Sequence, residues 1–113
     1  PYPSPAQFLN RLAVAVDALS RYGIRVAAVR VCVYHPRAAA HAVQRAALEV
    51  RAGMQRAAMT GDWHVYTTAR ARKPQPLMLR SVRAAEYWGD SEEDGEAARA
   101  AGVPFVRVER FLG

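Results

Sequence analysis

The chain has 113 residues, of which 51% are apolar, and a formal net charge of +6. This composition argues against a disordered chain, and the length predicts a single α/β domain over residues 1–113. Neither a run of ~20 apolar residues nor a signal-peptide pattern is present, so we expect a cytoplasmic protein with no membrane partner. The single cysteine, Cys32, excludes an internal disulfide and fits a reducing compartment.

The elements expected along the chain alternate between helix and strand. After an extended lead-in at residues 1–5, helices are predicted over residues 6–22, 37–60, 74–82 and 92–101, and strands over residues 24–34, 84–88 and 103–108. Residues 61–72 are predicted as a loop with a short strand at 63–67. The alternation predicts a Rossmann-like parallel sheet with flanking helices and right-handed crossovers.

The first helix and the first strand have the strongest local signals. Ser4 followed by Pro5 is a typical N-cap and first-turn pair, and Gly23 is a helix stop. Residues 24–34 are rich in β-branched side chains, and their nearly continuous apolar character predicts a strand that is buried on both faces.

The charge is unevenly distributed. Six of the ten acidic residues lie between residues 86 and 96, so the rest of the chain is more basic than the total suggests. A basic surface attracts phosphate-bearing ligands, including nucleic acid, although a compositional bias toward Arg and Ala explains the charge as well. The helix at 37–60 carries Arg45, Arg51 and Arg56, which form either a solvated face or a nucleic-acid-contacting one.

Lys73 is the only lysine, beside fifteen arginines, and prolines follow it at positions 74 and 76. Lysine offers a compact point charge on a flexible stem, whereas arginine offers a broad planar fork. Lys73 is therefore a candidate for neutralising phosphoryl oxygens, and an ordinary surface lysine is the alternative.

Asp90 directly follows the strand predicted at 84–88, and Asp94 comes four residues later. Ligands of open parallel sheets bind at the carboxyl ends of the strands, and carboxylates suit a hard cation such as Mg²⁺. The alternative is that the polar residues at 91–93 cap the next helix. A zinc site is not expected, because Cys32 and His35 supply only two ligands.

Two stretches of the chain together resemble a known family. They are Lys73-Pro74-x-Pro76-x-x-Leu79, and a strand ending in Gly89-Asp90-x-x-x-Asp94 that leads into the alanine-rich run Ala97 to Val106. These stretches resemble the third and fourth motifs of the haloacid dehalogenase (HAD) superfamily, and most closely its histidinol-phosphate and heptose-bisphosphate phosphatase branch. The resemblance covers residues 24 to 108 and is most specific from Lys73 onward.

The resemblance implies a Mg²⁺-dependent phosphatase that acts on a phosphorylated metabolite or a nucleic-acid end. In that family an aspartate nucleophile attacks the phosphoryl group. Lys73 would stabilise the nucleophile and the phosphate as a catalytic residue, and Asp90 would bind Mg²⁺. Asp94 would support the metal site or orient Lys73, while Arg70 and Arg72 would face the anionic substrate.

The Asp-x-Asp nucleophile motif of that family is absent from this chain. Because the first residue is Pro1 rather than Met, we expect the nucleophile-bearing strand to precede Pro1 or to have been lost. A partner chain or an oligomer would then complete the sheet, since an incomplete parallel sheet exposes unpaired backbone. The alternative function is a non-catalytic HAD-scaffold module whose basic surface binds nucleic acid or a protein partner.

Overall fold

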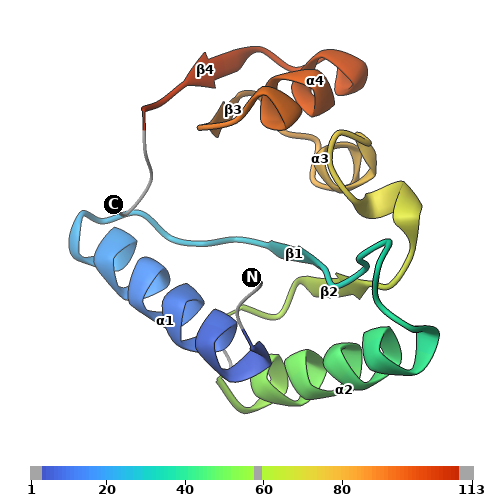
Figure 1. The fold of residues 1–113 in the computed structure, drawn as a ribbon. Helices are drawn as coiled ribbons and strands as arrows, with labels where there is room; N and C mark the ends of the chain where they lie inside the picture. The colour runs from blue at the N-terminus through green and yellow to red at the C-terminus, as the bar shows by residue number, and fades with distance from the viewer. Residues whose placement is uncertain (1–3, 58–59, 110–113) are drawn as a thin grey trace. The chain divides into compact units, whose positions relative to one another are not determined.

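A computed structural model describes residues 4–57 and 60–109 (Figure 1). The chain divides into two compact units, residues 1–67 and residues 68–113. Each unit contains one two-stranded parallel sheet among the described residues. The α/β class and the parallel pairing are therefore confirmed, while the single Rossmann-like sheet and the single domain stay predictions.

The first unit is built from two helices and two strands. They are α1 (Pro5–Arg21), β1 (Val29–Cys32), α2 (Ala40–Ala57) and β2 (Trp63–Tyr66). Its core consists of buried apolar residues from the two strands and from α2, namely Val29, Val31, Ala47, Val50, Met54 and Val65. Phe8, Leu9 and Leu12 of α1 pack against this core. Gly53 allows α1 and α2 to approach closely, since a Cβ at this position would overlap the side chain of Leu9.

The predicted start of α1 is confirmed in detail. The Ser4 hydroxyl accepts a hydrogen bond from the backbone N–H of Gln7, and the Gln7 side chain accepts one from the backbone N–H of Ser4. This reciprocal pair satisfies two N–H groups that the helix leaves without a partner. Gly23, with a φ of 76°, follows the end of the helix. The first residues of the predicted lead-in, 1–3, lie outside the described residues.

The prediction for residues 24–34 is only partly correct. The strand covers Val29–Cys32, and the burial along it alternates, so one face is buried and the other is half-buried. Its partner β2 begins at Trp63, which is paired with Val29, and β2 therefore has no residue opposite 24–28. Ile24, in the segment without a partner strand, is 52% exposed.

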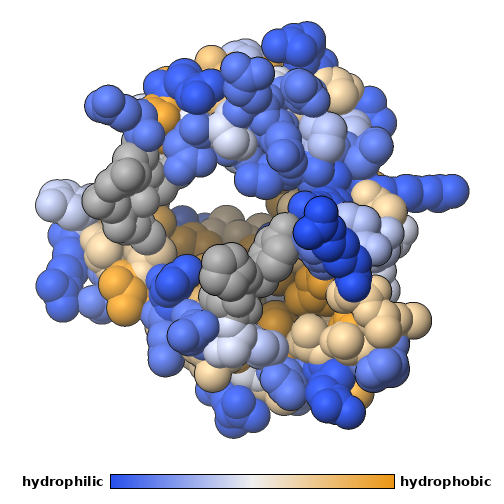
Figure 2. Space-filling model, in the orientation of Figure 1, coloured by the Kyte–Doolittle hydropathy of each residue, from blue (hydrophilic) through white to orange (hydrophobic). Residues whose placement is uncertain are grey.

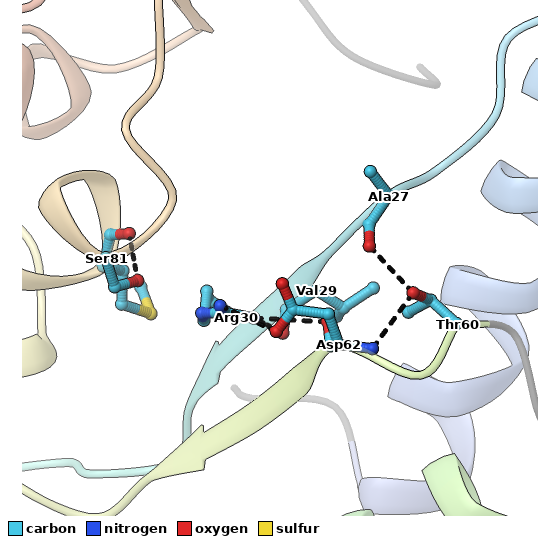
Figure 3. A network of polar contacts seen from close by, with 7 residues as sticks. Ala27, Val29, Arg30, Thr60, Asp62 and Ser81 are labelled. Atoms are coloured by element: carbon cyan, nitrogen blue, oxygen red, sulfur yellow. Dashed lines mark hydrogen bonds and ion pairs between the residues drawn. The ribbon is translucent and has the colours of Figure 1, made fainter.

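Polar contacts fasten the beginning of β2 to β1 (Figure 3). The Arg30 guanidinium pairs with the Asp62 carboxylate at 2.9 Å and also donates to the backbone carbonyls of Val29 and Asp62. The Thr60 hydroxyl donates to the carbonyl of Ala27 at 2.8 Å. These contacts position residues 60–62, which precede β2. The predicted helix over 37–60 therefore extends too far, because Thr60 is not helical.

The second unit contains η1 (Ala69–Ala71), α3 (Leu77–Ser81), β3 (Tyr87–Gly89), α4 (Glu92–Ala101) and β4 (Phe105–Arg107). β3 pairs with β4 in parallel, with Tyr87 opposite Phe105. α4 contacts both strands and α3. The predicted bounds of α4 are correct, and Gly102 ends the helix with a φ of 71°. The strand predicted at 84–88 begins later and includes Gly89.

Most of the residues visible in Figure 2 are hydrophilic, and apolar residues are exposed among them. In the first unit the large exposed apolar side chains are Val14, Leu19, Tyr22, Ile24 and Leu48. Over residues 4–57 and 60–109, none of the helices has the length and hydropathy needed to cross a membrane.

Candidate functional site

The second unit contains Asp94, the one charged residue that is buried in the described part of the chain. Its side chain is the centre of a cluster that we call the Asp94 network, formed with Lys73, Tyr87, Ser91 and the backbone of Asp90. All of these residues belong to residues 68–113, so their geometry is set within one unit.

One carboxylate oxygen of Asp94 accepts hydrogen bonds from two side chains. The Lys73 ammonium lies 2.7 Å from Oδ1, and the Tyr87 hydroxyl donates to the same oxygen at 2.7 Å. The Lys73 side chain is 44% exposed. The network thus joins a buried carboxylate to the ammonium of a partly exposed lysine side chain.

The other oxygen of Asp94 faces the start of α4. Oδ2 accepts hydrogen bonds from the backbone N–H groups of Asp90 and Ser91, each at 3.2 Å. The Ser91 hydroxyl accepts in turn from the backbone N–H of Asp94, which completes a capping box. Ser91 is therefore the N-cap, as the capping interpretation predicts. Asp94 takes part in the capping box and also binds the Lys73 ammonium.

These contacts decide the charge of Asp94. Burial alone would raise the pKa of the carboxyl group, but hydrogen bonds from Lys73, Tyr87 and Ser91 outweigh it and lower the pKa to about 2. Burial and the hydrogen bond to Asp94 raise the pKa of the Tyr87 hydroxyl well above its ordinary value of 10. Near neutral pH, Asp94 is therefore an anion and Tyr87 a neutral donor.

Gly89 makes the burial of Asp94 possible. A Cβ at position 89 would lie 2.5 Å from Cβ of Asp94 and 2.7 Å from its carboxylate carbon. No side chain fits at that distance, so Gly89 lets the first turn of α4 sit directly on β3. The Gly-Asp pair of the sequence motif thus has a packing reason that does not depend on any ligand.

Asp90 is exposed and follows the carboxyl end of β3 directly. Its backbone N–H donates a hydrogen bond to Oδ2 of Asp94. The four acceptor positions of the Asp94 carboxylate are already used by Lys73, Tyr87 and the two backbone N–H groups. A metal bound by Asp94 would have to displace one of these donors, whereas Asp90 is exposed.

The structure brings Lys73, Asp90 and Asp94 together. Arg70 lies exposed in η1, and Arg72 is half-buried just after it. Cys32 and His35 belong to the first unit. Within the described ranges, no three His, Cys, Asp or Glu side chains are grouped closely enough to hold a metal by themselves.

Sequence reasoning missed Tyr87. The sequence predicts it only as a strand residue, although Tyr87 stands two positions before Gly89 and so shares a face of the strand with it. This placement was the signal that could have identified Tyr87, because a half-buried tyrosine hydroxyl usually finds a hydrogen-bond partner.

Comparisons of the chain with protein-family models, with curated proteins and with solved structures found no match.

Proposed function

We propose that the chain supplies the electrostatic part of a Mg²⁺-dependent phosphatase site of the HAD type, for a phosphorylated metabolite or a nucleic-acid end. The observation that carries this proposal is the Lys73–Asp94 contact of 2.7 Å beside an exposed Asp90. A half-exposed ammonium oriented by a buried carboxylate is suited to a phosphoryl oxygen.

The charge around the network supports a role for a cation. Lys73 is neutralised by Asp94, and the exposed residues at the start of α4 add the charges of Asp90, Glu92 and Glu93. A phosphate dianion would be repelled by this end of the helix unless a divalent cation stood between them. Asp90 would provide one carboxylate ligand, and Mg²⁺ commonly keeps several waters.

The covalent step requires a group that this chain does not hold. As the family resemblance implies, a nucleophilic aspartate from outside the chain would attack phosphorus and release the alcohol, and water would then hydrolyse the aspartyl phosphate. Within the chain, the Lys73 ammonium would donate hydrogen bonds to the phosphoryl oxygens. A partner chain or a further segment would supply the aspartate and complete the sheet.

The metal role can be tested without catalysis. On titration with Mg²⁺, we expect the backbone amide signals of Asp90 and Ser91 to shift in the wild-type protein and to stay fixed in Asp90→Asn. Glu96→Gln is the matched control, because Glu96 is an exposed carboxylate further along the same helix. Equal shifts in the wild type and in Asp90→Asn would overturn the proposed ligand. In the protein that includes the nucleophile, hydrolysis of an aryl phosphate should require Mg²⁺ and disappear in Asp90→Asn.

A second function, nucleic-acid binding without catalysis, is favoured by the charge of the first unit. Residues 1–67 contain eight arginines and three acidic residues, a net charge of +5. Arg45 and Arg56 are exposed on α2 and stand eleven positions apart, close to three helical turns, so they share one stripe. Arg51 differs, because its guanidinium donates to the backbone carbonyl of Val65.

For this second function we expect the affinity for a single-stranded oligonucleotide to fall steeply with rising salt. The double variant Arg45→Gln, Arg56→Gln should lower both the affinity and the salt slope. Arg99→Gln, an exposed arginine of the second unit, is the matched control. The absence of binding at low salt would remove this candidate.

A further inference from the structure

Tyr87 contacts another aromatic ring of the second unit as well as Asp94. Its ring lies against that of Phe105, its partner across the β3–β4 pair, with centroids 5.9 Å apart. Phe105 is itself in contact with α4, since a Cβ on Gly95 would lie 3.3 Å from its ring. The tyrosine ring has few torsions of its own, so the sheet and the helix together fix where its hydroxyl lies.

That hydroxyl and the Lys73 ammonium share a single oxygen atom. Each is 2.7 Å from Oδ1 of Asp94. An ionised carboxylate oxygen has two lone-pair directions. While the tyrosine hydroxyl occupies one of them, the ammonium is confined to the other.

We propose that Tyr87 is a positioning residue for Lys73, whose hydroxyl restricts the ammonium to one lone pair of Asp94 and so sets where the lysine presents its remaining N–H groups to an anionic oxygen. The geometric part of this inference stands on the contacts of the Asp94 network alone. Its meaning for phosphoryl recognition rests on the proposed function.

Asp94 uses only part of the hydrogen-bonding capacity of the Lys73 ammonium. Lys73 contributes one of its three donors to Asp94 and, with a 44% exposed side chain, leaves the other two for a ligand. Tyr87 thus acts on a ligand through Lys73, without being required to touch it.

The single lysine makes the test unambiguous. In protein labelled with ¹⁵N only at lysine, the one side-chain ammonium signal belongs to Lys73. We expect the wild type to show this signal with slow exchange of the ammonium protons with water. In Tyr87→Phe the exchange should become about two- to tenfold faster, the range that the loss of one ordering hydrogen bond gives. Asp94→Asn should accelerate the exchange further.

Tyr66→Phe is the matched control, because Tyr66 is a half-buried strand tyrosine of the first unit, and it should leave the Lys73 signal unchanged. A second variant, Phe105→Leu, keeps the Tyr87 hydroxyl but removes the ring that packs against Tyr87. Its ammonium exchange rate should lie between those of the wild type and Tyr87→Phe. An exchange rate in Tyr87→Phe equal to that of the wild type, with the amide signals of β4 in place, would overturn the proposal.

A separate measurement distinguishes this inference from the proposed function. In the presence of Mg²⁺, inorganic phosphate should bind about two- to tenfold more weakly to Tyr87→Phe than to the wild type. If the ammonium exchange changes as expected while neither protein binds phosphate, the positioning role of Tyr87 holds and the proposed function fails.

Discussion

The two units of this chain are stabilised by different means. The first unit buries an apolar core drawn from two strands and two helices, including Met54 and Val65. Among residues 68–109, the buried hydrophobic side chains of the second unit are the small Ala71, Ala97 and Ala98, and the charged Asp94 is buried with them. The hydrophobic effect therefore dominates in residues 1–67, while a polar network orders much of residues 68–113.

The units also differ in charge. The first carries +5, whereas the second has seven arginines and one lysine against seven acidic residues, a net charge of +1. In the balanced unit the carboxylate of the ion pair is buried, whereas the carboxylates of the two ion pairs in the described part of the basic unit are exposed. A change in a carboxylate should therefore have very different consequences in the two units.

The largest effect is expected for Asp94→Ala. This change leaves the backbone N–H groups of Asp90 and Ser91 and the Tyr87 hydroxyl without their acceptor, and we expect about 4 kcal/mol of lost stability. Chemical denaturation measures the loss, and hydrogen exchange should locate it in α4 and β3. Unchanged amide protection in α4 would contradict the role given to the network.

Met54→Ala should instead lower the stability of the first unit. Met54 is 1% exposed and packs among strand and helix residues, so truncation costs about 3 kcal/mol through lost burial and a cavity. Amide exchange should accelerate in β1 and β2. The exposed Leu48, changed to Ala, is the control on the same helix and should cost far less. Equal losses at the two positions would argue against the described core.

Acid should weaken the second unit first. The pKa of Asp94 is lowered from 3.8 to about 2, so its stabilising contribution is complete above pH 4 and is lost as the pH falls toward 2. The linked loss is about 2 kcal/mol. Denaturation measured at pH 5 and at pH 2 should show it in the wild type, and Asp94→Asn should remove this part of the dependence. A variant with an undiminished acid dependence would place the responsible carboxyl group elsewhere.

The smallest effect is expected for Asp17→Asn. Asp17 pairs with Arg21 one helical turn away at 3.0 Å, but both side chains are more than half exposed. Exposed pairs of this kind contribute about 0.3–0.5 kcal/mol, and salt screens them. Thermal denaturation at low and high salt should show a small difference that shrinks with salt. If Asp17→Asn lost as much stability as Asp94→Ala, the proposed difference between exposed and buried carboxylates would be wrong.

Local signals in the sequence predict much of the fold. Ser4, Pro5 and Gly23 predict the ends of α1, and Ser91 and Gly102 mark those of α4, because caps act within one turn. The lengths of the strands are less predictable, since a strand extends only as far as its partner does. Residues 24–28 have strand composition but no β2 residue opposite them.

For the candidate site, the sequence by itself singled out Lys73, Asp90 and Asp94, since residue type and spacing are visible in one dimension. Only the tertiary structure decided that Asp94 is buried, that both its oxygens are saturated and that Tyr87 shares one of them with Lys73. The reason is physical: Gly89 lets α4 rest on β3, and this contact between elements removes Asp94 from water and brings Tyr87 within hydrogen-bonding distance. A hydrogen bond between side chains depends on where two backbones lie in space, which a motif does not specify.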